Sequence, residues 1–285
     1  MYVRAKFFRK SFACTQTCIY ILMSLKTELG LIELRKSGDT VTTIARARIL
    51  AAEVKDKALK SGASLVGIVS AGSVDALPSI WVGWEIQENT KKASELMSDA
   101  ASVVVVGYHV WDDMLELAIR KGEKWVYPSY FPLQILTLEL ISFLETKGYK
   151  AILPDSLSYK RLAQLAGFGN YGKNALVINP EFGPWIRLSA ILTNAEMAPD
   201  RPFEENICGD CEECVKACPV GALTPYRVDD AKCLVGIHIS RKEDSKSGKA
   251  LSKYEPSLTR NSHLMCMKCQ KACILGRDKR GLSDD

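Results

Sequence analysis

Apolar residues recur every three or four positions in two stretches of the chain, the spacing that places side chains on one face of a helix. The first stretch covers residues 41–61, with Val41, Ile44, Ala47, Ala51, Val54 and Ala58. The second covers residues 133–147, with Leu136, Leu140, Phe143 and Leu144. Gly62 and Gly148 follow, at the position where glycine commonly ends a helix. We therefore expect two amphipathic helices.

Short apolar runs between and after these helices predict strands. The strand candidates are residues 65–69, 103–106, 151–153 and 175–178. The second is a run of four valines ending at Gly107, a composition typical of a central strand. A further helix is expected at residues 158–166, and residues 70–90 read as loop. Helices and strands alternate up to about residue 200, which predicts an α/β or α+β layer fold.

After Pro199 cysteines dominate and the apolar periodicity weakens, so a second domain is expected to begin there. We predict an N-terminal extension at residues 1–36, an α/β cofactor or substrate domain at 37–200 and a cluster domain at 201–285. For the extension, the simplest interpretation is that translation starts at Met23. Cys14 and Cys18 would then not belong to the mature protein.

Composition and charge narrow the class of protein. Charged residues make up 25% of the 285 residues, an ordinary value for a globular protein. No run of about 18 apolar residues or signal peptide pattern is found, so a cytoplasmic protein without a membrane span is expected. Residues 241–285 hold eleven Lys or Arg and six acidic residues. Such a tail can attract phosphates or an acidic redox partner, or can simply be a solvated face.

Eight of the ten cysteines follow the spacing of bacterial ferredoxins. The first run is C-x2-C-x2-C-x3-C-P, and an isolated cysteine and a C-x2-C-x3-C run come after it. In such proteins the fourth cysteine of a run ligates the other cluster. This rule assigns one [4Fe–4S] cluster to Cys208, Cys211, Cys214 and Cys273. It assigns a second to Cys218, Cys233, Cys266 and Cys269, which leaves no ligand over.

Disulfide bonds and zinc sites are two other possible uses of these cysteines. Disulfides are disfavoured because nothing directs the chain to an oxidising compartment. Zinc sites usually combine two C-x2-C pairs, whereas here three cysteines at x2 spacing precede Cys218-Pro219. The two-cluster interpretation is therefore preferred.

A glycine-rich segment lies within the predicted α/β domain. Residues 167–174 read GFGNYGKN and contain a formal G-x-G-x-x-G. A dinucleotide-binding fingerprint follows a strand and opens a helix, whereas this segment follows a helix and leads into a strand. We reject dinucleotide binding and retain two alternatives. Either the segment binds another cofactor through Gly167, Gly169, Gly172, Lys173 and Asn174, or its glycines form a helix C-cap and a tight turn.

The residues RLAQLAGFGNYGKNALVINPEFGPWIRLSAILTN (161–194), with CGDCEECVKACPVGAL and AKCLVGIHIS, resemble the epoxyqueuosine reductase family. The likeness extends to KALKSGASLVGIV (57–69), MSDAASVVVVGYHV (97–110) and the closing CMKCQKAC. It implies an α+β fold: a cobalamin-reductase-like, nitroreductase-related α/β sandwich followed by a ferredoxin-like double-cluster domain.

The resemblance also implies a function. The family reduces an epoxide on a modified tRNA base with cobalamin and two [4Fe–4S] clusters. A ferredoxin or flavodoxin would donate electrons, and tRNA would be a partner. No D-x-H-x-x-G motif offers cobalamin a lower-ligand histidine, in agreement with the family. The three histidines, His109, His238 and His263, are expected to be ordinary residues.

Two residues are candidates for catalysis. Asp155 stands where the family carries its proposed proton donor, a role that suits a partly buried carboxyl with a raised pKa. The alternative is a helix N-cap. Tyr130, near the family's Asp-Tyr-His segment, could bind substrate or could be a packed aromatic residue.

Other functional classes remain open at this point. The chain could be a non-catalytic ferredoxin-type electron-transfer protein, or a reductive activator of a separate corrinoid protein. Bound corrinoid would distinguish these from the reductase. A flavin- or radical-based reductase is a weaker option, because a separate C-x3-C-x2-C site is missing.

Overall fold

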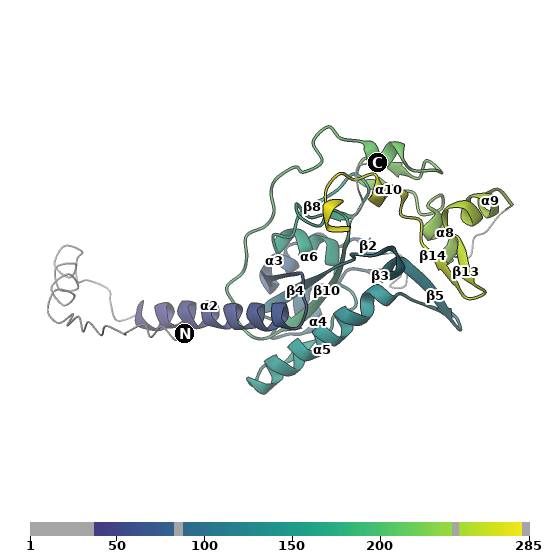
Figure 1. Ribbon diagram of the computed structural model, residues 1–285. Helices are drawn as coiled ribbons and strands as arrows, with labels where there is room; N and C mark the ends of the chain where they lie inside the picture. Colours follow the sequence, from purple (N-terminus) through teal and green to yellow (C-terminus); the bar gives the residue numbers. More distant parts are fainter. Residues whose placement is uncertain (1–36, 83–87, 241–244, 281–285) are drawn as a thin grey trace, which may run out of the picture. The chain divides into compact units, whose positions relative to one another are not determined.

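The computed structural model describes residues 37–82, 88–240 and 245–280 (Figure 1). The predicted N-terminal extension, with Met23, Cys14 and Cys18, lies outside the described residues. The chain divides into two compact units, residues 1–44 and 45–285. The first contributes only the opening of helix α2 (Ser37–Lys60) to the description. Below, "sheet region" means residues 45–200 and "cysteine region" means residues 207–275.

The sheet region is built on a four-stranded antiparallel sheet in the order β1-β4-β10-β7. Its strands are β1 (Leu65–Ser70), β4 (Ser102–His109), β7 (Ala151–Ile152) and β10 (Ile186–Thr193). The valine run is buried in β4, an interior strand paired on both sides, as its composition predicts. Ile68, Val104 and Ile191 form one row across the three longer strands.

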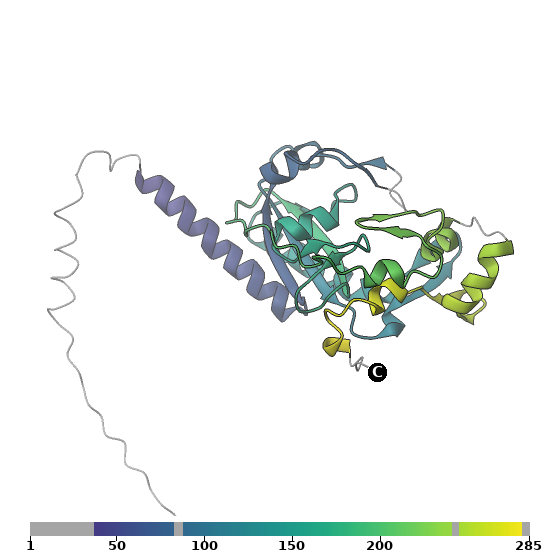
Figure 2. The same ribbon diagram turned by 90° about the horizontal axis from the view of Figure 1, so that it is seen from above.

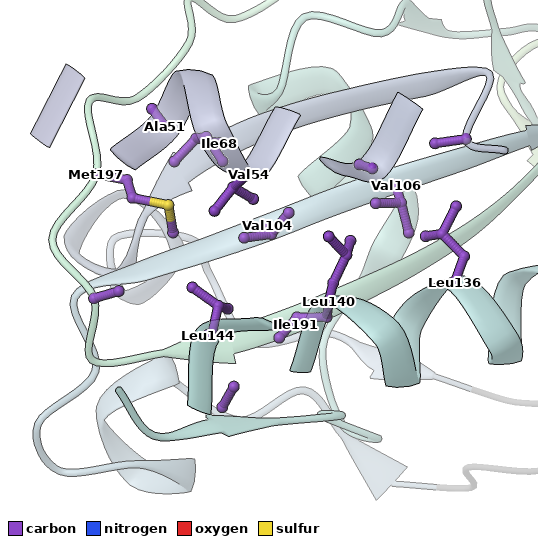
Figure 3. Close-up of a cluster of buried hydrophobic side chains, with 14 of the residues drawn as sticks. Ala51, Val54, Ile68, Val104, Val106, Leu136, Leu140, Leu144, Ile191 and Met197 are labelled. Atoms are coloured by element: carbon purple, nitrogen blue, oxygen red, sulfur yellow. The ribbon is translucent and has the colours of Figure 1, made fainter. Parts of the chain in front are cut away.

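Helices cover both faces of this sheet. The helices of the sheet region are α2, α3 (Ala71–Asp75), α4 (Ala93–Leu96), α5 (Phe131–Thr146) and α6 (Tyr159–Leu165), with 3-10 turns η1 (Asp113–Glu116) and η2 (Pro128–Tyr130). Because side chains alternate along a strand, Val104 and Val106 face α2 and α5, whereas Val103 and Val105 face α3 and α6. Figure 3 shows the first of these cores, where Val54 and Leu140 meet the sheet.

The sequence-based helices and strands of the sheet region are found within a few residues of their expected bounds, with two corrections. Ile44 is half exposed, and the buried residues of α2 begin at Ala47 and include Leu50, which the expected stripe did not contain. Residues 70–90 were expected to be loop but hold α3 and the short strands β2 (Trp81–Val82) and β3 (Glu88–Asn89).

A second four-stranded sheet joins distant parts of the chain. Its order is β13-β14-β5-β6, with β5 (Leu117–Lys121), β6 (Lys124–Val126), β13 (Ser257–Thr259) and β14 (Ser262–Leu264). The hairpin β13–β14 comes from the cysteine region, and β5–β6 from the sheet region. The two regions therefore share hydrogen-bonded strands. The domain boundary near residue 200 stays a prediction.

The rest of the cysteine region consists of short elements (Figure 2). They are α7 (Glu213–Lys216), β11 (Leu223–Thr224), β12 (Arg227–Val228), α8 (Leu234–Ser240), α9 (Ser245–Tyr254) and α10 (Lys268–Lys271), with η3 (Asp278–Arg280) after it. Strands β8 (Asn170–Tyr171) and β9 (Val177–Ile178) form a hairpin after α6. Within the described residues, no helix is long and apolar enough to cross a membrane.

Candidate iron–sulfur centres and the neighbouring polar site

Each cysteine run wraps around one short helix. Cys214 lies in α7, and Cys269 lies in α10. The backbone N–H of Cys211 donates to the carbonyl of Cys208 at 2.9 Å, and that of Cys273 to the carbonyl of Gln270 at 3.1 Å. Helices α7 and α10 contact each other, so the two runs meet. This arrangement concentrates thiols in a small volume.

The thiols of the first predicted set lie close enough to interact electrostatically. Burial raises the pKa of Cys273, and the neighbouring thiols of Cys208, Cys214 and Cys211 raise it further. Burial also raises the pKa of Cys214, with added contributions from Cys208 and Cys211. Cys273 is thus placed with residues more than fifty positions earlier in the chain. These interactions agree with the set that the ferredoxin crossover rule assigns to Cys273, and the assignment stays a prediction.

The second predicted set gathers in the same way. Burial raises the pKa of Cys269 to about 12, with smaller contributions from Cys266, Cys233 and Cys218 and the smallest from Cys214. Burial raises the pKa of Cys233, and Cys218 adds to it. All eight cysteines are free thiols in the structure. Among the described residues, no three or more Cys, His, Asp or Glu side chains are already close enough together to hold a metal ion. A cubane cluster requires four thiolates, and iron would displace the thiol protons on binding.

Backbone amides act on several of these sulfur atoms. The amides of Gly236 and Val235 partly offset the raised pKa of Cys233, and the amide of Leu275 partly offsets that of Cys273. The N–H of Ala222 donates to Sγ of Cys218 at 3.2 Å. Such bonds stabilise thiolate charge and tune the reduction potential of iron–sulfur clusters. The role of each cysteine as a ligand stays a prediction.

The two candidate catalytic residues lie around a third residue, Tyr159. Burial raises the pKa of Tyr159 to about 12, and both Tyr130 and Asp155 add to this shift. The Tyr159 hydroxyl donates to the carbonyl of Pro154 at 2.5 Å. The sequence analysis did not single out Tyr159, which has no motif around it. Tyr159 therefore lies within electrostatic range of both candidates, and its phenol stays protonated near neutral pH.

The environment of Asp155 differs from the expectation. Its side chain is exposed rather than partly buried, whereas the next residue, Ser156, is fully buried. The N-cap alternative is also wrong, because the N-cap of α6 is Ser158. The Asp155 carboxylate instead accepts a hydrogen bond from the Ser156 hydroxyl at 3.0 Å, which also bonds to Glu88. This bonding turns Ser156 inward and leaves Asp155 facing solvent.

Tyr130 keeps 40% of its surface exposed and packs its ring edge-on against Tyr127, with 6.2 Å between ring centroids. It precedes α5 without a side-chain capping bond. The packing contact agrees with the packed-aromatic alternative, and the exposed part of the ring leaves the substrate role as a prediction.

The glycine-rich segment is accounted for by contacts within the chain. Gly167 follows the end of α6 with a φ of 80°, as a helix C-cap requires. A Cβ at Gly169 would lie 2.0 Å from the carbonyl oxygen of Ile178, and one at Gly172 would lie 2.4 Å from its side chain. These glycines allow β8 and β9 to close tightly. The segment follows a helix and enters a hairpin, which agrees with the rejection of a dinucleotide fold.

Lys173 and Asn174 are buried at the tip of this hairpin. Asn174 Oδ1 accepts a bond from the backbone N–H of Leu176 at 3.1 Å, a local turn contact. The carbonyl of Lys173 accepts from the N–H of Tyr226 at 3.2 Å, and its Nζ lies 3.9 Å from Oε1 of Glu212. Glu212 stands between Cys211 and Cys214. Lys173 thus connects the hairpin to the first thiol group, and cofactor binding by these residues stays a prediction.

Buried polar residues that the sequence analysis missed lie near η1 and η2, which contact each other. The Glu116 side chain is 1% exposed and forms an ion pair with Arg187 of β10. Among the residues that the structure describes, Glu116 Oε1 and Ser129 Oγ are buried without a hydrogen-bond partner. The Lys160 ammonium has a lowered pKa because surrounding atoms desolvate it and Arg187 repels it. Isolated charged residues without a motif carry no sequence signal for such a site.

A cavity lies between the loop before β2 and the start of α6. Its lining includes Lys91, Lys92, Glu95 and Arg161, together with apolar residues such as Leu157. Neither Asp155 nor Tyr130 lines it. It is therefore separate from the group of residues around Tyr159.

Comparisons with known proteins address the cysteine region first. The family described as "4Fe-4S double cluster binding domain" matches residues 207–275. Epoxyqueuosine reductase of Listeria monocytogenes is 48% identical over 67 residues, which are 24% of this chain and 17% of that protein. Epoxyqueuosine reductase of Prochlorococcus marinus is 28% identical over 209 residues, 65% of this chain and 66% of that protein. The chain thus spans less than two thirds of the length of the curated relatives it matches.

Solved structures show the same fold. Two epoxyqueuosine reductases, each 22% identical, cover 81% of this chain and 66% of their own. One, from Bacillus subtilis with its catalytic aspartate loop swung out of the active site, has a TM-score of 0.57. The other, with a tRNA stem loop, has a TM-score of 0.58. This chain resembles the epoxyqueuosine reductases. A reductive dehalogenase described in terms of B12-dependent dehalogenation matches at 19% identity, 84% and 34% coverage and a TM-score of 0.56.

These comparisons confirm the resemblance to epoxyqueuosine reductases, the α+β fold and the double-cluster domain that the sequence analysis expected. Side-chain contacts also join the C-terminal part of the chain to the sheet region. The Arg280 guanidinium is buried, lies 3.7 Å from the Trp185 ring centroid, and bonds to the carbonyl of Val110 and the carboxylate of Asp113. Lys271 of α10 also reaches Asp113, at 2.5 Å. Lys271 thus ties the cysteine region to η1 of the sheet region, and Arg280 does the same for the turn η3 that follows the cysteine region.

Proposed function

We propose that this chain is an iron–sulfur oxidoreductase that passes electrons through two [4Fe–4S] clusters to a bound cobalamin and reduces an electrophilic substrate. The substrate we propose is epoxyqueuosine in tRNA. The observation that carries the proposal is the match of residues 207–275 to a 4Fe-4S double cluster binding domain, within a fold shared with epoxyqueuosine reductases.

The path of electrons follows from the arrangement of the thiols. Cys269 interacts mainly with the second group and, more weakly, with Cys214 of the first. Two clusters held by these groups would therefore be close neighbours. Lys173 joins Glu212 of the first run to the β8–β9 hairpin, which provides a physical contact between the cysteine region and the sheet region. A ferredoxin or flavodoxin is the proposed electron donor.

The residues around η1 and η2 suit a cofactor that carries amide groups. Glu116 Oε1 and Ser129 Oγ are buried and unpartnered in the described residues, and buried polar atoms normally have a hydrogen-bond partner. A cobalamin side-chain amide could donate to the first and bond to the second. Cobalamin, when bound, supplies a strongly reducing metal centre. Arg187 would hold the Glu116 carboxylate in place.

Proton supply is the proposed role of Asp155, Tyr130 and Tyr159. With a pKa of about 12, the Tyr159 phenol stays protonated near neutral pH and can donate a hydrogen bond. Asp155 is exposed here. The Bacillus subtilis reductase with its catalytic aspartate loop swung out of the active site provides a parallel for an aspartate that moves. We propose that Asp155 turns toward Tyr159 when substrate binds.

The tRNA substrate rests on the relatives, one of which was solved with a tRNA stem loop. Exposed basic residues of the cysteine region, such as Lys249, Lys253 and Lys268, could contact phosphates. Because the chain spans only part of its relatives, the substrate is the part of the proposal that depends most on experiment.

Metal and corrinoid analysis of anaerobically purified, cobalamin-reconstituted protein tests the proposal. We expect about eight irons and about one cobalt per chain, with a retained corrinoid absorption band. Eight irons without corrinoid would instead favour the electron-transfer protein or reductive activator. Zinc in place of iron would exclude both.

A single-turnover assay with epoxyqueuosine-containing tRNA tests the proton donor. Asp155→Asn should lower turnover by about 10²-fold or more, because the amide cannot supply a proton. Asp99→Asn is the matched control. Asp99 is also an accessible aspartate, paired with Lys150 and Asn194, and its loss should leave turnover unchanged. Equal turnover in D155N and wild type would reject the role of Asp155.

A further inference from the structure

The cavity between the loop before β2 and the start of α6 has no part in the proposed function. Apolar side chains line some of it, among them Val74, Leu157 and Leu162. Its volume of about 120 Å³ exceeds the roughly 30 Å³ that one water molecule occupies in the liquid. The cavity therefore has room for a group larger than a single water molecule, such as a phosphate.

Basic side chains line another part of this cavity. Lys91 and Lys92 lie between β3 and α4, and Arg161 lies in α6. The Lys91 ammonium lies 3.5 Å from the Glu88 carboxylate, whereas neither Lys92 nor Arg161 forms an ion pair with a residue that the structure describes. The lining holds one acid, Glu95, whose carboxylate accepts the backbone N–H of Lys92 at 2.9 Å. Three cationic side chains and one anionic side chain leave an excess of positive charge.

The hydrogen-bond donors of the lining suit an anion with several oxygen atoms. Nη1 of Arg161 donates to the carbonyl of Pro78 at 2.6 Å, which fixes the guanidinium and leaves its other N–H groups for a ligand. Ser158 also lines the cavity, and its hydroxyl forms no capping bond with α6. A guanidinium, ammonium groups and a hydroxyl are the donors that phosphate oxygens commonly accept.

The loop that carries Asp155 contributes to the same cavity. Leu157 and Ser158 line it, although Asp155 does not. The backbone N–H of Lys91 donates to the carbonyl of Ser156 at 3.0 Å, so the segment between β3 and α4 is already bonded to this loop. An anion that contacts both segments would add further bonds between them. It would therefore restrict the movement of the loop.

We propose that this cavity binds a phosphate group and that the bound phosphate restrains the loop that carries Asp155. The phosphate belongs either to the backbone of the substrate RNA or to a small phosphorylated molecule, and the same donors recognise both. The role of the restrained loop rests on the proposed function, since it requires that Asp155 act on the substrate. In RNA, the phosphate would flank the reacting nucleoside, because neither Asp155 nor Tyr130 lines the cavity.

Binding of an unmodified tRNA anticodon stem loop to the full-length holoprotein tests the inference, because this RNA has no epoxide and binds without turnover. Lys92→Gln and Arg161→Gln should each weaken binding by about 5- to 10-fold, because each removes a charged donor. The slope of log K against log salt should become less steep by about 0.7, the value for one phosphate contact on a single strand. Lys92→Arg keeps the charge and should bind like the wild type.

Lys60→Gln is the matched control. Lys60 is an exposed lysine of α2 that pairs with Asp56 and does not line the cavity. Its loss removes the same charge from the protein and should change neither the affinity nor the salt slope. An equal loss of affinity in K60Q and K92Q would show a general effect of charge and would overturn the inference.

Hydrogen–deuterium exchange with mass spectrometry measures the effect on the loop. The stem loop should slow exchange in residues 88–95 and 153–162 of the wild type, and should do so much less in K92Q. Inorganic phosphate is the second probe. Protection by the stem loop alone assigns the cavity to the RNA backbone, and protection by inorganic phosphate alone assigns it to a small phosphorylated molecule. Protection by neither probe would overturn the inference.

Iron and cobalt measured in the same wild-type sample distinguish this failure from a failure of the proposed function. Absence of clusters and corrinoid would reject the proposed function, while binding of inorganic phosphate to the cavity could still be measured. Both cofactors present, with binding and protection in K92Q and R161Q equal to those of the wild type, would reject the inference alone.

Discussion

In the sheet region, helices α2 and α5 press apolar side chains against one face of a sheet, and α3 and α6 do so on the other. In the cysteine region, among the described residues, the cluster around α8 and α9 has only three buried apolar residues, Leu234, Ile237 and Leu251. The comparison indicates that hydrophobic burial folds one region, while bound metal stabilises the other.

The strongest test of this comparison is removal of iron. Anaerobic chelation should abolish most hydrogen-exchange protection in residues 207–237 and 265–275, because few apolar contacts remain to hold them. Strands β4 and β10 should keep their protection. Hydrogen–deuterium exchange with mass spectrometry measures both in one sample. Full protection of the cysteine region after loss of iron would break the comparison.

A pair of cysteine variants sharpens the comparison within the cysteine region. Cys269→Ser and Cys273→Ser alter neighbouring turns of one motif but are predicted to remove different clusters. Each should lower the iron content from about eight to about four per chain. The electron paramagnetic resonance spectra of the two variants should differ, since a different cluster remains in each. Identical spectra from the two variants would contradict the assignment of ligands.

In the sheet region, the corresponding test is a substitution that opens a cavity in the core. Leu140 on α5 is 0% exposed, and Leu140→Ala should reduce the free energy of unfolding by about 2–5 kcal/mol. Leu138 on the same helix is 66% exposed, so Leu138→Ala should change the free energy of unfolding by only about 0.5 kcal/mol or less. Urea unfolding followed by circular dichroism compares them. Similar losses in both variants would show that α5 does not contribute to the core as described.

The smallest expected effect concerns pH. Tyr159 has a pKa of about 12 in the folded protein, above the ordinary value of about 10 in an unfolded chain. Its contribution to stability is complete below pH 10 and is lost as pH rises toward 12. Between pH 9 and pH 11 the wild type should therefore lose about 1 kcal/mol more free energy of unfolding than Tyr159→Phe does. Unfolding curves at both pH values measure this, and an unchanged pH dependence would contradict the assignment.

Much of the sheet region could be predicted because local patterns determine it. The Val103–Val106 run and the periodic leucines of α5 are buried as their spacing requires. The double-cluster domain could also be predicted, since the cysteine spacing follows a ferredoxin rule and residues 207–275 match a double-cluster family. The cluster ligands themselves stay a prediction.

Other features depend on contacts between residues far apart in the chain. Ser156, next to the exposed Asp155, bonds to Glu88, a partner 68 positions away. Glu116 meets Arg187 across 71 positions. Periodicity says nothing about such pairs. The strands β5 and β14 are short, and each is stabilised by a partner that the sequence alone does not identify.

The sheet that β5 and β6 share with β13 and β14 has a practical consequence for anyone who would divide this protein. Separate expression of the first 200 residues would leave the edge of β5 with unpaired backbone groups, a template for aggregation. The other half would keep a lone two-stranded hairpin, which is marginally stable in water. Transplanting the ferredoxin-like portion onto another protein would therefore fail unless β5 and β6 travel with it.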